Sequence, residues 1–158
     1  MANPIARLFA RLLLERPAAR IGLDALVARL EASRGPLAAV AEAGEDAAAR
    51  TQLRHVIAIE RWGQNRLRVV LGDVAFERDE SRGYAPPEDE PLGQLIERFD
   101  AVRRATVALA RRIADAEAGA TMVEHNALGP ISARAWLRYL QVHAELELKR
   151  VKPRRPTT

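Results

Sequence analysis

Two of the three histidines in this 158-residue chain are placed where a metal site between helices would need them. His143 precedes Glu147 by four residues in a helical pattern, and side chains at this spacing lie on one face of a helix. His55 lies in another helical, apolar-rich segment. If these two helices pack side by side, three ligands converge. The spacing therefore predicts a candidate metal site formed by His55, His143 and Glu147, without naming a reaction.

Each of these residues also has a simpler interpretation. A lone histidine on a partly apolar helix face, such as His55, is often a packed, hydrogen-bonded side chain. Glu147 taken alone is most simply a solvated helix glutamate. His143 and Glu147 each precede a residue of the apolar stripe, which places them on the shoulder of the buried face. A cleft between helices would be lined from that shoulder.

The other candidate residues have weaker claims to a functional role. His125 is expected in a loop, where it either borders the mouth of the site or orders the start of the following helix. Glu60 comes five residues after His55, so it points away from it and is expected to be exposed or to play a supporting role. Trp62 and Trp136 are expected in the core or in a cleft wall. Three arginines are most simply a solvated helix face: Arg61, Arg66 and Arg68.

The elements that must position these residues are four long helical patterns and a short leading one. The leading segment, residues 1–20, is amphipathic. The first long pattern shows a stripe of leucines from Leu23 onward, and Gly35-Pro36 should kink or split it. The second pattern runs from about Ala47 to Leu71, with Gly72 as a plausible C-cap.

The second half of the chain begins with a long loop, Asp73–Glu90, of a length that is often functional or disordered. Pro91 suits the first turn of the third helix. Its apolar residues recur with a period of 3.5, which predicts near-parallel bundle packing. A further loop leads to Ser132, a natural N-cap for a fourth helix that extends to about Val151. The expected fold is an all-α four-helix bundle over residues 21–151.

Composition narrows the classes of function. The absence of cysteine excludes disulfides, thiolate metal sites and a cysteine nucleophile, and suits a reducing cytoplasm. No apolar run approaches the roughly 18 residues of a membrane span.

The net charge of +4 comes from basic residues at the end of the chain, which argues against nucleic-acid binding by the rest of the protein. Residues 152–158 are expected to form a basic, solvated tail, and a tail of this kind binds polyanions weakly and in a salt-sensitive way.

Two segments resemble the DinB-like superfamily of metal-binding four-helix bundles. Residues 53–62, LRHVIAIERW, are similar to its second helix, and residues 125–143, HNALGPISARAWLRYLQVH, to its loop and fourth helix. The resemblance covers roughly Leu23 to Val151 in helix order and loop placement. It implies an up-down-down-up bundle, preceded here by the short extra N-terminal helix.

The resemblance also implies a divalent metal held by one histidine of the second helix and a pair spaced four apart on the fourth. These positions fall on His55, His143 and Glu147. The usual pattern has a second histidine where this chain has Glu147, although relatives in the mycothiol-dependent maleylpyruvate isomerase group use a carboxylate. Nickel, zinc, iron or manganese would suit two imidazoles and a carboxylate.

Three protein ligands would leave a position open for water or for a low-molecular-weight thiol. The implied activity is thiol transfer or metal-assisted hydrolysis on a small molecule that the sequence does not identify. The alternative is a metal-free interaction or scaffold module, in which the leading helix packs on a second copy of the chain through five apolar side chains: Ile5, Leu8, Phe9, Leu12 and Leu13.

Overall fold

The computed structural model describes residues 3–33, 36–42 and 46–151, and it is mostly helical with one small antiparallel hairpin. The leading segment is helical from Pro4 to Ile21: α1 (Pro4–Ala10), a π-helical turn (Arg11–Glu15) and α2 (Arg16–Ile21). The helices that follow are α3 (Leu23–Ala32), α4 (Pro36–Glu42), α5 (Ala47–Val70), α6 (Leu92–Asp115) and α7 (Ala133–Leu148). The expected break at Gly35-Pro36 separates α3 from α4, and Gly35 itself lies outside the described residues.

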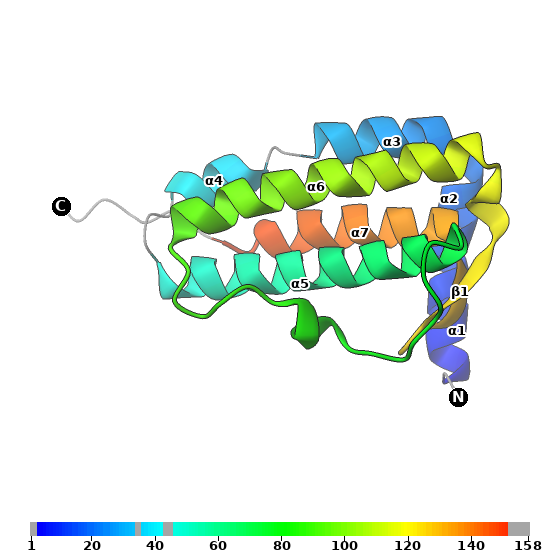
Figure 1. Cartoon of the computed structure of the whole chain (residues 1–158), viewed down its shortest axis with the longest axis horizontal. Coiled ribbons are helices and arrows are strands. Elements are labelled where there is room, and N and C mark those ends of the chain that lie inside the picture. The colour runs from blue at the N-terminus through cyan, green and yellow to red at the C-terminus, as the bar shows by residue number, and fades with distance from the viewer. Residues whose placement is uncertain (1–2, 34–35, 43–45, 152–158) are drawn as a thin grey trace.

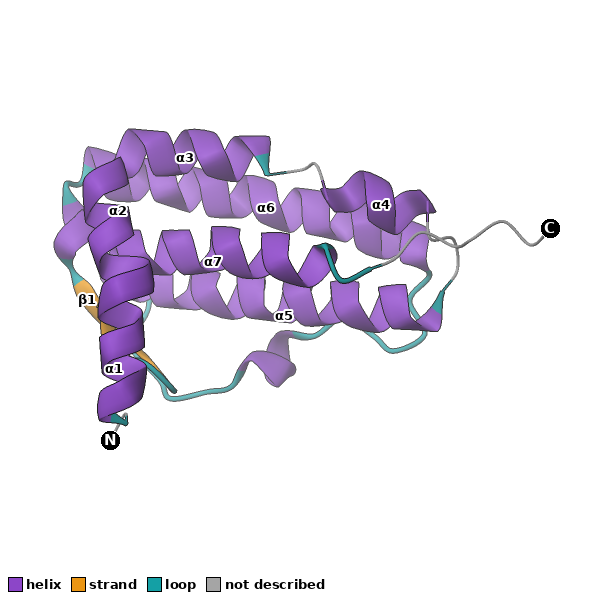
Figure 2. Ribbon diagram, turned by 180° about the vertical axis from the view of Figure 1, so that it is seen from behind, coloured by secondary structure: helices purple, strands orange, loops and turns teal. Residues whose placement is uncertain are grey.

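The long helices lie along one axis and pack on one another. α3 packs against α6 and α7, and α5 packs against the same two helices. In Figure 1, α5 and α6 run in one direction along this axis, and α3, α4 and α7 run in the other. The α1–α2 segment stands across one end of these helices in both Figure 1 and Figure 2.

The boundaries of α5 follow from residues at its two ends. The Asp46 side chain accepts hydrogen bonds from the backbone N–H groups of Ala48 and Ala49 and so caps the first turn. At the other end, Gly72 has a φ of 75°, a conformation that favours glycine. The N–H of Gly72 bonds to the carbonyl of Val69, and that of the next residue to the carbonyl of Arg68. This is the Schellman arrangement, and it confirms the expected role of Gly72 in ending the helix.

Because α5 and α6 are parallel, the chain between them must return along the length of α5. Arg66 donates to Asp79, Arg61 to the carbonyl of Tyr84, and Arg54 to the carbonyl of Pro86. Later residues of the loop are thus bonded to earlier residues of α5, which shows that the loop runs antiparallel to this helix. The loop expected at Asp73–Glu90 is thus present, contains a 3₁₀ turn at Ser81–Tyr84, and is fastened along α5.

The connection before α7 differs from the expected irregular loop. Strands β1 (Met122–His125) and β2 (Gly129–Ser132) form an antiparallel pair in which His125 is opposite Gly129. The strands are four residues long, too short for a sequence pattern to identify them. Ser132 ends β2 and caps α7 by accepting from the N–H of Ala135, as expected. The helix expected after Pro91 is α6, which ends at Asp115, ahead of Gly119. The expected fourth helix is α7, which ends at Leu148 rather than Val151.

No described helix has the combination of length and apolar character that a membrane crossing requires. Residues 152–158, the expected basic tail, lie outside the described residues.

Candidate functional site

The first two predicted site residues meet across the α5–α7 contact. The ring centroids of His55 and His143 are 5.1 Å apart, and the ring planes are inclined by 60°. Seven residues further along α5, Trp62 packs on Trp136, which lies seven residues before His143. The two helices are therefore antiparallel, and this register places the two imidazoles opposite each other.

The environment of His143 favours a neutral imidazole. Burial, together with nearby His55, lowers its pKa to about 4, although Glu147 acts in the opposite direction. At neutral pH this ring therefore carries no charge and keeps a free nitrogen lone pair. No hydrogen bond from another described residue engages a nitrogen of His55 or His143. Both imidazoles are thus free to bind a ligand.

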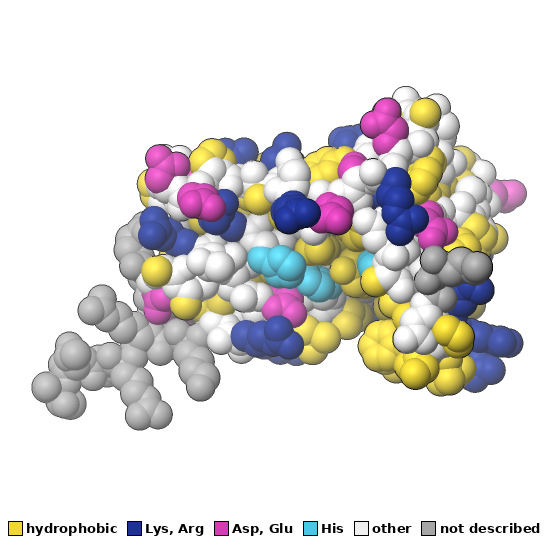
Figure 3. Space-filling view, turned by 90° about the horizontal axis from the view of Figure 1, so that it is seen from below, with side chains coloured by type: hydrophobic (Ala, Val, Ile, Leu, Met, Phe, Trp, Pro, Cys, Tyr) yellow, Lys and Arg dark blue, Asp and Glu magenta, His cyan; other side chains and the backbone are white. Residues whose placement is uncertain are grey.

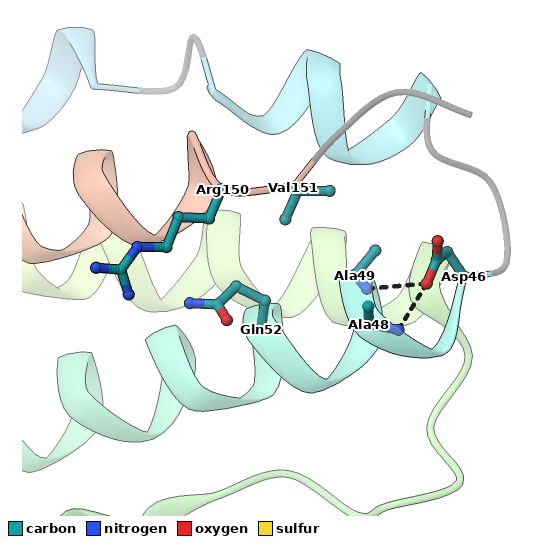
Figure 4. A pocket seen from close by; sticks show the side chains of 6 residues that line it. All are labelled: Asp46, Ala48, Ala49, Gln52, Arg150 and Val151. Atoms are coloured by element: carbon teal, nitrogen blue, oxygen red, sulfur yellow. Dashed lines mark hydrogen bonds between the residues drawn. The ribbon is translucent and has the colours of Figure 1, made fainter. Parts of the chain in front are cut away.

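Glu147, the third predicted ligand, is engaged by other side chains. The Gln52 amide donates to its Oε2, and the Arg150 guanidinium lies 2.9 Å from each of its carboxylate oxygens. Figure 4 shows Gln52 on α5 and Arg150 just beyond α7, reaching into the space between the two helices. In the described part of the chain, no group of three His, Asp or Glu side chains is arranged to hold a metal ion. The residues offer two imidazoles for a metal, and the carboxylate of Glu147 is engaged by Gln52 and Arg150.

A mainly apolar pocket of about 360 Å³ lies beside His143. One wall comes from α7, and the other from the leading segment, which is fastened to α7. The backbone N–H and the hydroxyl of Ser132 both donate to the Glu15 carboxylate, and the Arg138 Nε donates to the carbonyl of Leu13. In Figure 3, histidine side chains (cyan) reach the surface beside a hollow lined with hydrophobic side chains (yellow).

His55 borders a second, smaller pocket of about 220 Å³. This pocket lies between α5 and the loop that returns along it, and its lining includes Ser81 and Arg82. Each histidine of the pair therefore borders its own pocket. The pocket beside His143 is bordered by the leading segment, and the pocket beside His55 by the long loop.

His125 lies in β1, not in a loop, and is 7% exposed. Its Nδ1 accepts hydrogen bonds from the N–H groups of Ala127 and Leu128, so it orders the hairpin turn that leads to α7. Its ring packs against Trp62, Trp136 and Tyr139, and burial lowers its pKa to about 4. Although it lines the same apolar pocket as His143, it is not part of the histidine pair.

The prediction of a solvated Arg66 was wrong, and of the two alternatives for Glu60 the structure excludes the exposed one. Glu60 points away from His55 as expected, but it is 1% exposed and forms an ion pair with equally buried Arg103. Arg66, expected in solvent, is fully buried against Asp79 and lies over the rings of Trp62 and Phe76. The sequence did contain a signal for the first pair, because Arg103 follows Phe99 by four residues and precedes Thr106 by three, spacings that place it on the same buried face of α6. Trp62 and Trp136 are buried, as expected.

Comparison of the chain with models of protein families, with curated proteins and with solved structures finds no match.

Proposed function

We propose that this chain is a DinB-like four-helix bundle that binds a divalent metal through His55 and His143. The observation that carries the proposal is the contact of these two imidazoles across α5 and α7. The opposed helix directions visible in Figure 1 agree with the up-down-down-up order of that superfamily. The lowered pKa of His143 adds support, because a metal binds the neutral form of imidazole.

In this proposal Glu147 is the third ligand. It faces the same region as the imidazoles, since its charge raises the pKa of both His143 and Tyr139. Gln52 and Arg150 hold its carboxylate and therefore compete with a metal for it. A divalent ion here, whether nickel, zinc, iron or manganese, would supply Lewis acidity toward a water or a small thiol. The proposed activity is thiol transfer or hydrolysis in the cytoplasm, with the apolar pocket beside His143 receiving the substrate.

Elemental analysis of protein purified without an affinity tag tests metal binding. We expect about one equivalent of metal in the wild type and none in His55→Ala or His143→Ala. Adding nickel, zinc or manganese to stripped wild-type protein should raise Tm, because a ligand that binds only the folded state stabilises it. Metal-free protein whose Tm does not respond to any of these ions would contradict the proposal.

The role of Glu147 can be tested with a matched pair of variants. Glu147→Gln should weaken metal binding, whereas Glu145→Gln on the same helix should not, because Glu145 is bonded to Gln141 instead. Gln52→Leu removes the competing donor and should strengthen metal binding. Equal affinities for the wild type and the Glu147→Gln and Gln52→Leu variants would remove Glu147 from the site.

A second candidate function is a metal-free module that binds another copy of itself. It is favoured by the way Gln52 and Arg150 hold Glu147, and by the leading segment, where the apolar residues Ile5, Leu8 and Leu12 are exposed, Ile5 at 75%. Light scattering should then show a dimer that dissociates in the double variant Leu8→Ser, Leu12→Ser. A monomeric wild type would exclude this candidate without affecting the metal proposal.

A further inference from the structure

The pocket beside His143 has walls of distinct chemistry. Its apolar part comes from both the leading segment and α7, with one residue from the hairpin: Phe9, Leu13, Leu14, Leu128, Val142 and Leu146. Its volume of about 360 Å³ lies at the small end of the range for small-molecule sites, roughly 300–1,000 Å³. These walls suit a short alkyl chain or a single aromatic ring.

The polar part of the lining consists of donors and imidazoles. Arg138 contributes a guanidinium whose Nε alone bonds to the described chain, at the carbonyl of Leu13. Tyr139 contributes a phenol hydroxyl to the same lining. This hydroxyl has no hydrogen-bond partner among the described residues, and it is not among their fully covered polar atoms.

The charge of the lining is one-sided. It contains Arg138 and no carboxylate. Glu147, which lies one residue beyond the lining residue Leu146, is paired with Arg150. An apolar molecule with a negatively charged end therefore complements this pocket better than a neutral or cationic one.

We propose that this pocket binds a small apolar carboxylate, with its hydrocarbon part between the leading segment and α7 and its carboxylate bound by Arg138 and the Tyr139 hydroxyl. This binding goes beyond the metal site and does not require it. The hydrocarbon part supplies most of the affinity through burial, and the charged end decides which apolar molecules are preferred.

Titration of octanoate into the full-length, chelator-treated protein tests this proposal, with binding followed by calorimetry and by the NMR shifts of α7. We expect saturable binding of octanoate and about tenfold weaker binding of octanol, the neutral analogue, because octanol lacks the charged end. Octanol binding as tightly as octanoate would overturn the assignment of a carboxylate.

Three variants locate the site. Arg138→Gln should weaken octanoate binding about tenfold more than octanol binding, because only octanoate uses the charge of the guanidinium, whereas the lost bond to Leu13 affects both ligands. Arg134→Gln is the matched control, because Arg134 also lies on α7 and bonds a backbone carbonyl through its Nε but does not line the pocket. Leu146→Trp should abolish binding by filling the pocket, and since Leu146 is 56% exposed this change should not disturb the fold.

The results of these experiments distinguish failure of the pocket proposal from failure of the metal proposal. Binding that survives Leu146→Trp, or no octanoate binding at millimolar concentration, would overturn the pocket assignment while leaving the metal proposal intact. Octanoate binding by a protein that takes up no metal would support the pocket and contradict only the metal site.

Discussion

At the scale of single residues, His125 and His143 have the same lowered pKa but different surroundings, and therefore different roles. Burial lowers the pKa of each to about 4, so both rings are neutral at physiological pH. The Nδ1 of His125 is occupied by two backbone N–H groups of the hairpin turn, which fixes its tautomer. His143 has no such partner among the described residues and faces His55 instead. The hydrogen bonds of the turn thus make His125 a structural residue, whereas no described residue hydrogen-bonds the ring nitrogens of His143.

The buried histidines predict a loss of stability in mild acid. The pKa of His125 is lowered from 6.5 in the unfolded chain to about 4 in the folded one. Between these values the unfolded state binds more protons, so the free energy of unfolding decreases as the pH falls from 6.5 toward 4. We expect His125 to contribute up to roughly 3 kcal/mol to this decrease. Urea denaturation of wild type and His125→Phe at several pH values measures it, and identical pH profiles would show that His125 does not titrate in this way.

The buried pair of Glu60 and Arg103 gives a second prediction at this scale. Burial raises the pKa of Glu60 and is opposed by the positive charge of Arg103. Arg103→Met leaves Glu60 buried without its partner and should reduce the free energy of unfolding by about 3–5 kcal/mol. The double variant Glu60→Gln, Arg103→Met should recover part of that loss, because no unpaired charge remains. A double variant less stable than Arg103→Met would show that Glu60 without its partner is not a costly buried charge.

At the scale of elements, the approach of α5 to α7 decides whether the histidines meet. Gly63 lies one residue beyond Trp62 on α5, at a point where the Leu140 side chain of α7 comes very close. An added Cβ would lie 2.6 Å from a methyl carbon of Leu140, which is closer than ordinary packing permits. The absence of a side chain at position 63 therefore leaves room for the Leu140 side chain where α5 and α7 meet.

Two glycine substitutions test this close approach. Gly63→Ala should reduce the free energy of unfolding by about 1–3 kcal/mol, because Leu140 is buried and must move. Gly93→Ala is the matched control in α6, where nothing lies within 4 Å of the added Cβ, and it should stabilise by up to about 1 kcal/mol through helix propensity. Thermal denaturation of both variants measures the difference. Equal effects would show that α5 and α7 separate at no cost.

At the scale of the whole molecule, the leading segment is part of the pocket because of contacts distant in sequence. Glu15 accepts two hydrogen bonds from Ser132, the residue that caps α7, and Leu13 accepts one from Arg138. These bonds join the two ends of the described chain and close one wall of the pocket beside His143. Loss of these contacts would open the pocket without unfolding α5, α6 and α7.

Hydrogen exchange can detect this opening. Glu15→Ala should accelerate amide exchange in residues 4–21 by about five- to thirtyfold, which corresponds to the 1–2 kcal/mol typical of lost bonds at a helix cap. Exchange in the middle of α5 should not change. Glu31→Ala, which removes an exposed carboxylate paired with Arg111, is the control and should leave residues 4–21 unaffected. Uniform acceleration throughout the chain would indicate global destabilisation instead.

The sequence by itself determined the elements whose signals are local. Helical periodicity, the caps at Ser132 and Gly72 and the break before Pro36 depend on neighbours a few residues away, so the helices and the long loop were predicted close to their observed bounds. From the residues alone, the pairing of His55 with His143 was conditional on their helices packing side by side, and the resemblance supplied that neighbour, because spacing along one helix does not specify the helix opposite.

Only the tertiary structure decided which polar side chains are buried and what they contact. Glu60 and Arg66 are residue types usually found on the surface, yet both are buried. Each has an oppositely charged partner from a distant part of the chain, Arg103 on α6 for Glu60 and Asp79 in the loop for Arg66. Glu147 has the right spacing for a ligand, but Gln52 and Arg150 hold it. Local patterns specify helices because their hydrogen bonds are local, whereas a site between helices depends on register and burial, which are set by packing across the whole molecule.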